Sequence, residues 1–129
     1  MIERLSILIP TYNNVCFGLV KDLQAQAALL PNFQYEILIA DDGSTDKKTV
    51  EENRVINTLE SCRYIEREKN EGRAVFRNFL AKESKYEWLL FIDSNMNVID
   101  SQYIANYQKA QESDVIYGGY QVKLHQENL

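Results

Sequence analysis

The chain has 129 residues, of which 45% are hydrophobic and 26% charged, and its formal net charge is −5. This length predicts one domain with a core of its own. The acidic balance is the opposite of the basic surface that nucleic-acid binders present, so no nucleic-acid partner is expected. A small phosphate-bearing ligand stays open, because local groups hold such ligands.

The chain shows no sign of export or of membrane insertion. Residues 1–4 run directly into a strand-like segment, and no apolar run approaches the length of a membrane span. Cys16 and Cys62 share no ligand-like spacing, which predicts two reduced, largely buried thiols. His125 lies in the polar segment 121–129 and is expected to be solvated. These features predict a cytoplasmic protein.

Strand-like and helix-like segments alternate along the chain. The segments predicted to be strands are short apolar runs, at 5–9, 35–40, 62–66, 88–92 and 115–122. The segments predicted to be helices repeat apolar residues at steps of three or four, over 15–30, 46–60, 73–84 and 100–107. Asn13 or Asn14 is the expected cap of the first helix and Asp100 of the last, and Val15 and Val75 are expected to face the core.

This alternation predicts an α/β fold. Its order implies a doubly wound, mostly parallel sheet with helices on both faces, in three α/β/α layers. In such sheets, ligands bind beyond the carboxyl ends of the strands. Three strands end in polar clusters, at 10–14, 41–46 and 93–97, so we expect these clusters to meet at one edge of the sheet and to form the binding site.

The residue types in these clusters indicate a nucleotide site of a particular kind. Neither a G-x-G-x-x-G dinucleotide motif nor a glycine-rich loop ending in Lys-Ser/Thr is present. Tyr12 instead offers a stacking face for a base, and an aspartate can accept a hydrogen bond from a ring N–H of uracil. Carboxylates at the end of the fourth strand suit a divalent cation that neutralises a diphosphate.

Four motifs carry a resemblance to a known family. In chain order they are Ser6–Asn13 (SILIPTYN), Glu36–Asp46 (EILIADDGSTD), Asn70-x-Gly72 with Arg77-Asn78, and Leu90–Asn95 (LFIDSN). Their order and spacing resemble a family 2 glycosyltransferase of the GT-A fold. The resemblance implies a Rossmann-like domain over 1–129 that binds a nucleotide sugar, cut off before the acceptor half.

The resemblance implies a base pocket at the first two polar clusters. The residues it assigns there are Pro10, Thr11, Tyr12, Asp41, Asp42 and Gly43. Tyr12 would line the base, and Asp42, with Asp41 as the alternative, would accept a hydrogen bond from it. Gly43 would permit the tight turn beneath.

The diphosphate end is implied at the later motifs. Arg73 and Arg77 would face the base and the diphosphate. Asp93-Ser94-Asn95 falls on the family's Asp-x-Asp motif, which holds the ribose and binds Mg²⁺ or Mn²⁺. Here Asn95 replaces the second aspartate. An amide oxygen can ligate a hard cation but lacks the charge, which predicts a weakened metal site at Asp93 and Asn95.

By the same resemblance, the full-length protein would be an inverting glycosyltransferase. It would transfer a sugar from a nucleotide-diphosphate donor, a UDP-sugar being favoured, to a hydroxyl of a glycan or lipid-linked acceptor in cell-wall or polysaccharide synthesis. The setting would be the inner face of the cell membrane, with peripheral association. The catalytic base is expected in the absent C-terminal half, so the 129-residue chain alone would be inactive.

Other interpretations stay open. The chain could be a nucleotide-binding module without transfer activity. Asp41-Asp42-Gly43-Ser44 could be a turn with a helix cap, Asp93 could only end a strand, and the two arginines could belong to a solvated helix face. A flavodoxin-like or response-regulator domain shares the acidic strand ends, but Lys123 lies past a glycine pair where a receiver's lysine is not expected.

Overall fold

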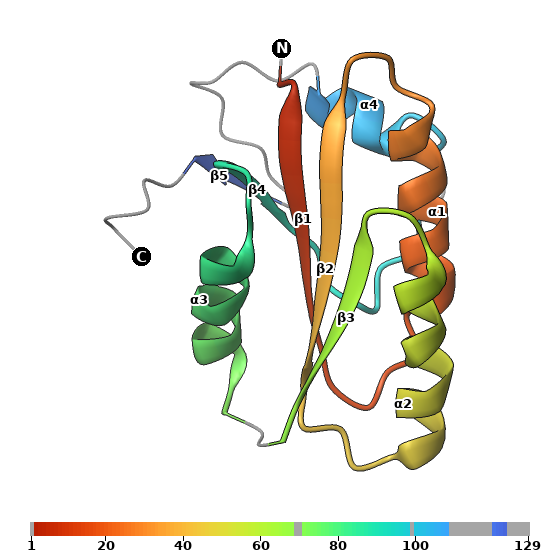
Figure 1. Cartoon of the computed structure of the whole chain (residues 1–129), viewed down its shortest axis with the longest axis vertical. Coiled ribbons are helices and arrows are strands. Elements are labelled where there is room, and N and C mark those ends of the chain that lie inside the picture. Colours follow the sequence, from red (N-terminus) through yellow and green to blue (C-terminus); the bar gives the residue numbers. More distant parts are fainter. Residues whose placement is uncertain (1, 69–70, 99, 109–119, 124–129) are drawn as a thin grey trace.

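The computed structural model describes residues 2–68, 71–98, 100–108 and 120–123 (Figure 1). The elements in chain order are β1 (Arg4–Thr11), α1 (Phe17–Ala28), β2 (Gln34–Asp42), α2 (Lys47–Arg54), the 3-10 turn η1 (Val55–Thr58), β3 (Cys62–Arg67), α3 (Arg73–Glu83), β4 (Trp88–Phe91), α4 (Tyr103–Gln108) and β5 (Tyr120–Lys123).

The strands form one sheet in the order β3-β2-β1-β4-β5. The first four in this order are parallel, and β5 is antiparallel to β4. The predicted mostly parallel, doubly wound α/β fold is therefore confirmed. Of the predicted last strand, 115–119 lie outside the described residues, as does His125.

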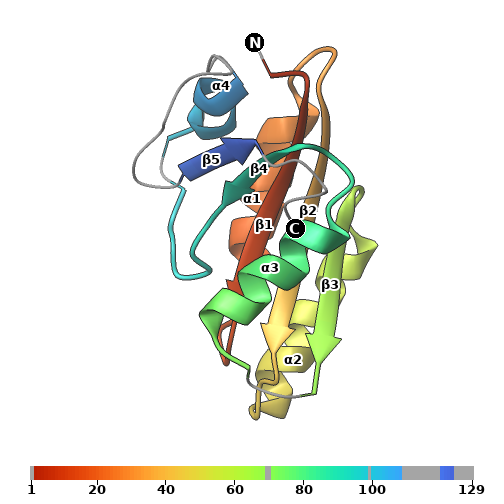
Figure 2. The same cartoon turned by 90° about the vertical axis from the view of Figure 1, so that its left-hand side faces the viewer.

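Helices cover both faces of the sheet, which gives the three predicted layers. Figure 1 shows α1 and α2 on one side of the sheet and α3 on the other, and Figure 2 shows α3 lying across β1 and β2. Leu5, Ile7 and Ile9 of β1 point into the larger core, which α1 and α4 also line. Leu8 points the opposite way and packs with Phe76 in the smaller core under α3. The central parts of β1, β2 and β4 are apolar runs because both faces of the sheet are buried there.

The first helix starts later than predicted. Cys16 is its N-cap residue, without a capping side chain, and Asn13 and Asn14 bond to neighbouring loops instead. Val15 therefore precedes the helix and is 46% exposed. The prediction failed because a polar side chain in front of an apolar repeat looks like a cap whether it bonds to its own helix or to another loop.

The other helices follow the prediction more closely. Asp46 caps α2 by accepting from Lys48 N at 3.1 Å, and the predicted helix 46–60 tightens into η1 after Arg54. Asp100 accepts from Gln102 N at 2.8 Å, just ahead of α4. The prediction that Val75 faces the core is wrong. Val75 is 44% exposed, because it lies about 100° around α3 from the buried Phe76.

Both cysteines are free thiols, Cys16 buried and Cys62 half-buried. Burial raises the pKa of each thiol to about 12. At neutral pH they are therefore protonated, in keeping with structural rather than nucleophilic roles. In the part of the chain that the structure describes, no helix has the length and apolar character needed to cross a bilayer.

Candidate nucleotide site

A cavity of about 220 Å³ lies where the carboxyl ends of β1 and β4 meet the end of β2. The chain builds β1, β2 and β3 in one direction and then places β4 on the other side of β1, so this is the switch point where open α/β sheets bind ligands. The residues that line the cavity are Pro10, Thr11, Tyr12, Asn14, Asp42, Phe76, Arg77, Phe91, Ile92, Asp93, Ser94 and Asn95.

The structure thus brings together most of the residues singled out in the sequence. Those lining the cavity are Pro10, Thr11, Tyr12, Asp42, Arg77, Asp93, Ser94 and Asn95. Asp41 and Gly43 are not among its lining residues. Arg73 is the first residue of α3, and its side chain lies outside what the structure describes.

The two adjacent aspartates of β2 have different surroundings because β2 extends through both of them. Consecutive strand residues point to opposite faces of a sheet. Asp42 points to the α3 side, where one carboxylate oxygen accepts from Glu71 N at 2.7 Å and the other from Gly72 N at 3.2 Å. Each oxygen keeps capacity for a second hydrogen bond, so Asp42 can still accept from a ligand in the cavity.

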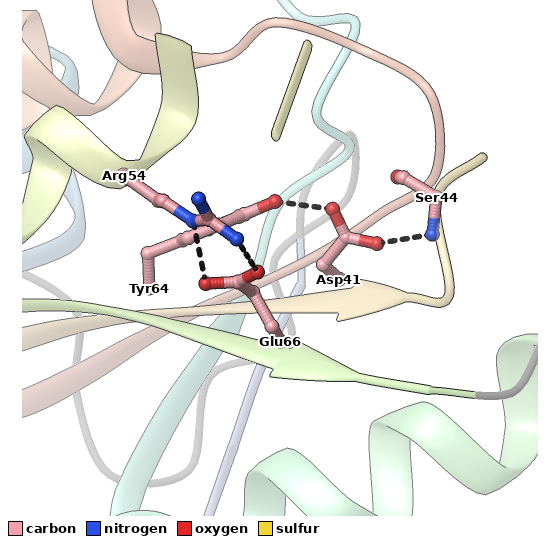
Figure 3. Close-up of polar contacts among 5 residues, drawn as sticks. All are labelled: Asp41, Ser44, Arg54, Tyr64 and Glu66. Carbon is pink, nitrogen blue, oxygen red and sulfur yellow. Dashed lines mark hydrogen bonds and ion pairs between the residues drawn. The ribbon is translucent and has the colours of Figure 1, made fainter. Parts of the chain in front are cut away.

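Asp41 points to the other face and is 2% exposed. Its carboxylate accepts a short hydrogen bond from the Tyr64 hydroxyl and another from Ser44 N at 2.7 Å (Figure 3). Burial, followed by this bond to Asp41, raises the pKa of Tyr64 and keeps its hydroxyl a donor. Asp41 therefore shapes the turn after β2, while the cap of the following helix is Asp46.

Beside this network, an ion pair joins α2 to the edge strand β3. Arg54 donates to both carboxylate oxygens of Glu66, at 3.0 and 2.8 Å (Figure 3). The hydrogen bond to Arg54 lowers the pKa of Glu66. Both side chains are largely exposed, so the pair contributes little to stability and shows only how α2 is held over β3.

The turn after β2 needs a glycine and is held by Asn13. Gly43 adopts a φ of 73°, a conformation that other residues reach only with strain. Asn13 Oδ1 accepts from Thr45 N at 2.9 Å and from Asp46 N at 3.0 Å, and Asn13 N donates to Ser44 Oγ at 2.8 Å. The loop after β1 is therefore bonded directly to the loop after β2.

A second asparagine bonds the loop after β1 to the loop after β4. Asn14 Nδ2 donates to Ser94 O at 2.9 Å and to Ser94 Oγ at 3.0 Å. The sequence predicted Asn13 and Asn14 as possible caps and as members of the polar cluster 10–14, but it did not predict this role. Their position between the strand and the helix was a signal, since amide side chains substitute for backbone partners in loops, but the partners could not be read from it.

The β4 end of the cavity combines one cationic and one anionic side chain. Arg77 of α3 lines the cavity, and its guanidinium carbon lies 5.5 Å from the centre of the Phe91 ring. Asp93 is exposed, and its Oδ1 accepts from Asn95 N at 2.9 Å. One oxygen of Asp93 is thus committed to the turn.

These groups fit a divalent cation only in company with a nucleotide. Within 2–68, 71–98, 100–108 and 120–123, no three acidic, histidine or cysteine side chains gather as a metal site. Asp93 supplies one carboxylate, and Asn95 can add an amide oxygen. Mg²⁺ and Mn²⁺ sites in nucleotide enzymes commonly use one or two carboxylates together with phosphate oxygens and water. With one carboxylate, this site has the smallest number of carboxylate ligands in that range.

The chain resembles known glycosyltransferases in sequence. A poly(ribitol-phosphate) beta-glucosyltransferase of Bacillus spizizenii is 32% identical over 125 residues, which cover 89% of this chain and 19% of that protein. TarS 1–349 of S. aureus, solved in complex with UDP, is 27% identical with a TM-score of 0.62 over 81% of this chain and 30% of that one. The chain therefore spans less than a third of the length of these relatives.

The fold is shared more widely. A mannosyltransferase of Pyrobaculum calidifontis, solved with GDP-Man and Mn²⁺, is 18% identical and has a TM-score of 0.66 over 82% of this chain and 31% of that one. Residues 6–126 match the family described as Glycosyl transferase family 2. This match excludes the flavodoxin-like and receiver interpretations. The chain belongs to glycosyl transferase family 2.

Proposed function

We propose that the cavity binds the nucleoside diphosphate of a sugar donor, a UDP-sugar being favoured, and that this chain is the donor-binding part of an inverting glycosyltransferase. The observation that carries the proposal is the placement of Tyr12, Asp42 and Asp93 around one cavity at the switch point. The complex of the related TarS with UDP supports the choice of nucleotide.

The cavity has chemically distinct ends that suit the parts of such a donor. Tyr12 offers an exposed ring for stacking, and Asp42 offers a carboxylate for a base N–H. Arg77, Asp93 and Asn95 would lie at the diphosphate. Mg²⁺ or Mn²⁺ held by Asp93 and Asn95 would neutralise the diphosphate charge, and Arg77 would stabilise the charge that grows on the leaving group.

In the proposed reaction, the acceptor hydroxyl oxygen attacks the anomeric carbon from the face opposite the diphosphate. The carbon–oxygen bond to the diphosphate breaks, its electron pair leaves with the phosphate oxygen, and the configuration inverts. A base takes the hydroxyl proton. We propose that this base and the acceptor site correspond to parts of the longer relatives that these 129 residues do not match. The chain by itself is therefore expected not to transfer sugar.

The relatives also suggest the class of acceptor. A polymer or lipid-linked glycan hydroxyl is proposed, because the Bacillus relative is named for poly(ribitol-phosphate). A cytoplasmic site at the inner membrane face, reached by peripheral association, goes with that acceptor. The single carboxylate at Asp93 also favours a second candidate, a donor-binding module without transfer activity, which sugar transfer by the full-length protein would exclude.

Titration calorimetry with UDP, GDP and CDP, each with Mn²⁺, tests the proposal. We expect saturable heat with UDP, and weaker binding of CDP because N3 of cytosine carries no hydrogen to donate to Asp42. The absence of heat with all three nucleotides at millimolar concentration would remove the proposed function.

Asn95 is expected to set the response to metal. In the wild type, Mn²⁺ should strengthen UDP binding only weakly, because one carboxylate is present where the family motif has two. Asn95→Asp should produce a clear, several-fold gain in UDP affinity on adding Mn²⁺. The control is Asn97→Asp, which adds the same charge to the same loop at a residue that does not line the cavity. A strong Mn²⁺ effect in the wild type that Asn95→Asp leaves unaltered would place the metal elsewhere.

A further inference from the structure

Asn53 is a fully buried polar residue that lies outside the proposed donor site. It belongs to α2, is 0% exposed and does not line the cavity. Its Oδ1 accepts from Cys16 N at 2.9 Å, and its Nδ2 donates to Asn14 O at 2.9 Å. Both ends of the amide therefore bond to the backbone of the loop between β1 and α1.

The backbone carbonyl of Asn14 has little hydrogen bonding apart from Asn53. Residues 12–16 belong to neither a strand nor a helix. Besides Asn53 Nδ2, the hydroxyl of Thr11 donates to Asn14 O, at a long 3.4 Å. The Asn53 amide thus supplies the donor and the acceptor that a neighbouring strand would supply within a sheet, and it holds the backbone of Asn14 in place.

The side chain of Asn14 extends the connection to the cavity. It donates to the backbone carbonyl and to the hydroxyl of Ser94, the residue between Asp93 and Asn95. The Asp93 side chain accepts from Asn95 N at 2.9 Å, and the Asp93 backbone carbonyl accepts from Met96 N at 3.0 Å. A continuous path of hydrogen bonds therefore runs from α2, through the loop after β1, to the β4 end of the cavity.

We propose that Asn53 is a positioning residue, which sets the place of the Asp93–Asn95 segment through Asn14 and so determines how tightly the diphosphate end of a donor is held. This inference rests on the proposed donor site. The position requires an amide, because one side chain must accept from Cys16 N and donate to Asn14 O at the same time. A merely structural amide would affect stability and leave the Asp93–Asn95 segment where it is.

The test compares two matched truncations, Asn53→Ala and Asn57→Ala. Asn57 lies one turn further on in η1, and its Oδ1 accepts from Tyr64 N at 2.9 Å, so its removal also deletes a side chain–backbone bond but one that leads away from the cavity. Amide chemical shifts of Ser94, Asn95 and Met96 are measured without nucleotide, and UDP affinity is measured with Mn²⁺ at a temperature where each variant is folded.

Asn53→Ala should shift the three amides and weaken UDP binding by at least about fivefold, whereas Asn57→Ala should do neither. Asn14→Ala breaks the same path at a surface loop and keeps the test available if Asn53→Ala fails to fold: it should produce the same shifts. In that background, Asn53→Ala should add no further shift at 94–96.

The outcomes separate this inference from the proposed function. Unchanged shifts at 94–96 and unchanged UDP affinity in Asn53→Ala would overturn the positioning role while wild-type binding upheld the donor site. Failure of the wild type to bind UDP would remove the donor site and with it the functional meaning of the path, whatever the shifts show.

Discussion

Asp42→Asn is expected to weaken UDP binding by about 10- to 100-fold. A charge-assisted hydrogen bond contributes about 1.5–3 kcal/mol, which corresponds to that range. The carboxylate already accepts from Glu71 N and Gly72 N, and an amide cannot accept at both of its ends. Because each oxygen of Asp42 accepts from a backbone N–H, the NH₂ group would face one of these donors in either orientation, so the substitution disturbs the turn as well as the charge offered to the base. Calorimetry with UDP measures the loss.

A matched control is Glu71→Gln, which removes one negative charge beside the same turn. Glu71 is exposed and pairs with Arg67 at 3.3 Å on the surface, and it does not line the cavity. UDP affinity should change little in this variant, because such surface pairs contribute at most about 1 kcal/mol even to stability. If Asp42→Asn instead lowers the melting temperature strongly and leaves UDP affinity intact, Asp42 is only the anchor of the turn before α3.

Phe76→Ala should have the largest effect on stability. Phe76 is 1% exposed and sits at the centre of the small core that joins α3 to Leu8, Leu38 and Leu89 of the sheet. Truncating a buried phenylalanine removes its burial and leaves a cavity, at a cost of about 3–5 kcal/mol. That is a large fraction of the stability of a domain of this size. Urea denaturation measures the change.

The adjacent residue gives the control. Val75→Ala changes an apolar side chain on the same helix that is 44% exposed, so the free energy of unfolding should change by no more than about 0.5 kcal/mol. Equal losses in both variants would mean that α3 packs on the sheet through a different face. Because Phe76 also lines the nucleotide cavity, UDP affinity is compared only under conditions where both variants are folded.

The fold could be predicted because its central strands are buried on both faces. Runs such as Ile7-Leu8-Ile9 and Trp88-Leu89-Leu90 are apolar without alternation, which distinguishes a parallel sheet covered by helices from an exposed one. The start of α1 and the exposure of Val75 in α3 were missed, because an apolar repeat fixes neither the first residue of a helix nor the border of its buried stripe. The antiparallel direction of β5 depends on how the chain returns, which no local pattern records.

The site could be located but not resolved from the sequence. Polar clusters after three strands predicted the edge of the sheet at which they meet, and the structure places them there. Asp41 and Asp42 stayed alternatives because β2 was expected to end at Ala40. Once the strand includes both, its period of two separates them onto opposite faces. The roles of Asn14 and Asn53 depend on contacts across 80 and 39 residues of sequence, which spacing cannot show.

The most direct test of the account is a crystal structure of the chain with UDP and Mn²⁺. We predict the uracil ring against Tyr12 with its N–H directed at Asp42, and the diphosphate between Arg77 and Asp93. A second cavity of about 380 Å³ lies beside the first, lined by the start of α1 and by 94–98. Uracil bound in that second cavity, with Asp42 making no contact to the nucleotide, would contradict the central claim.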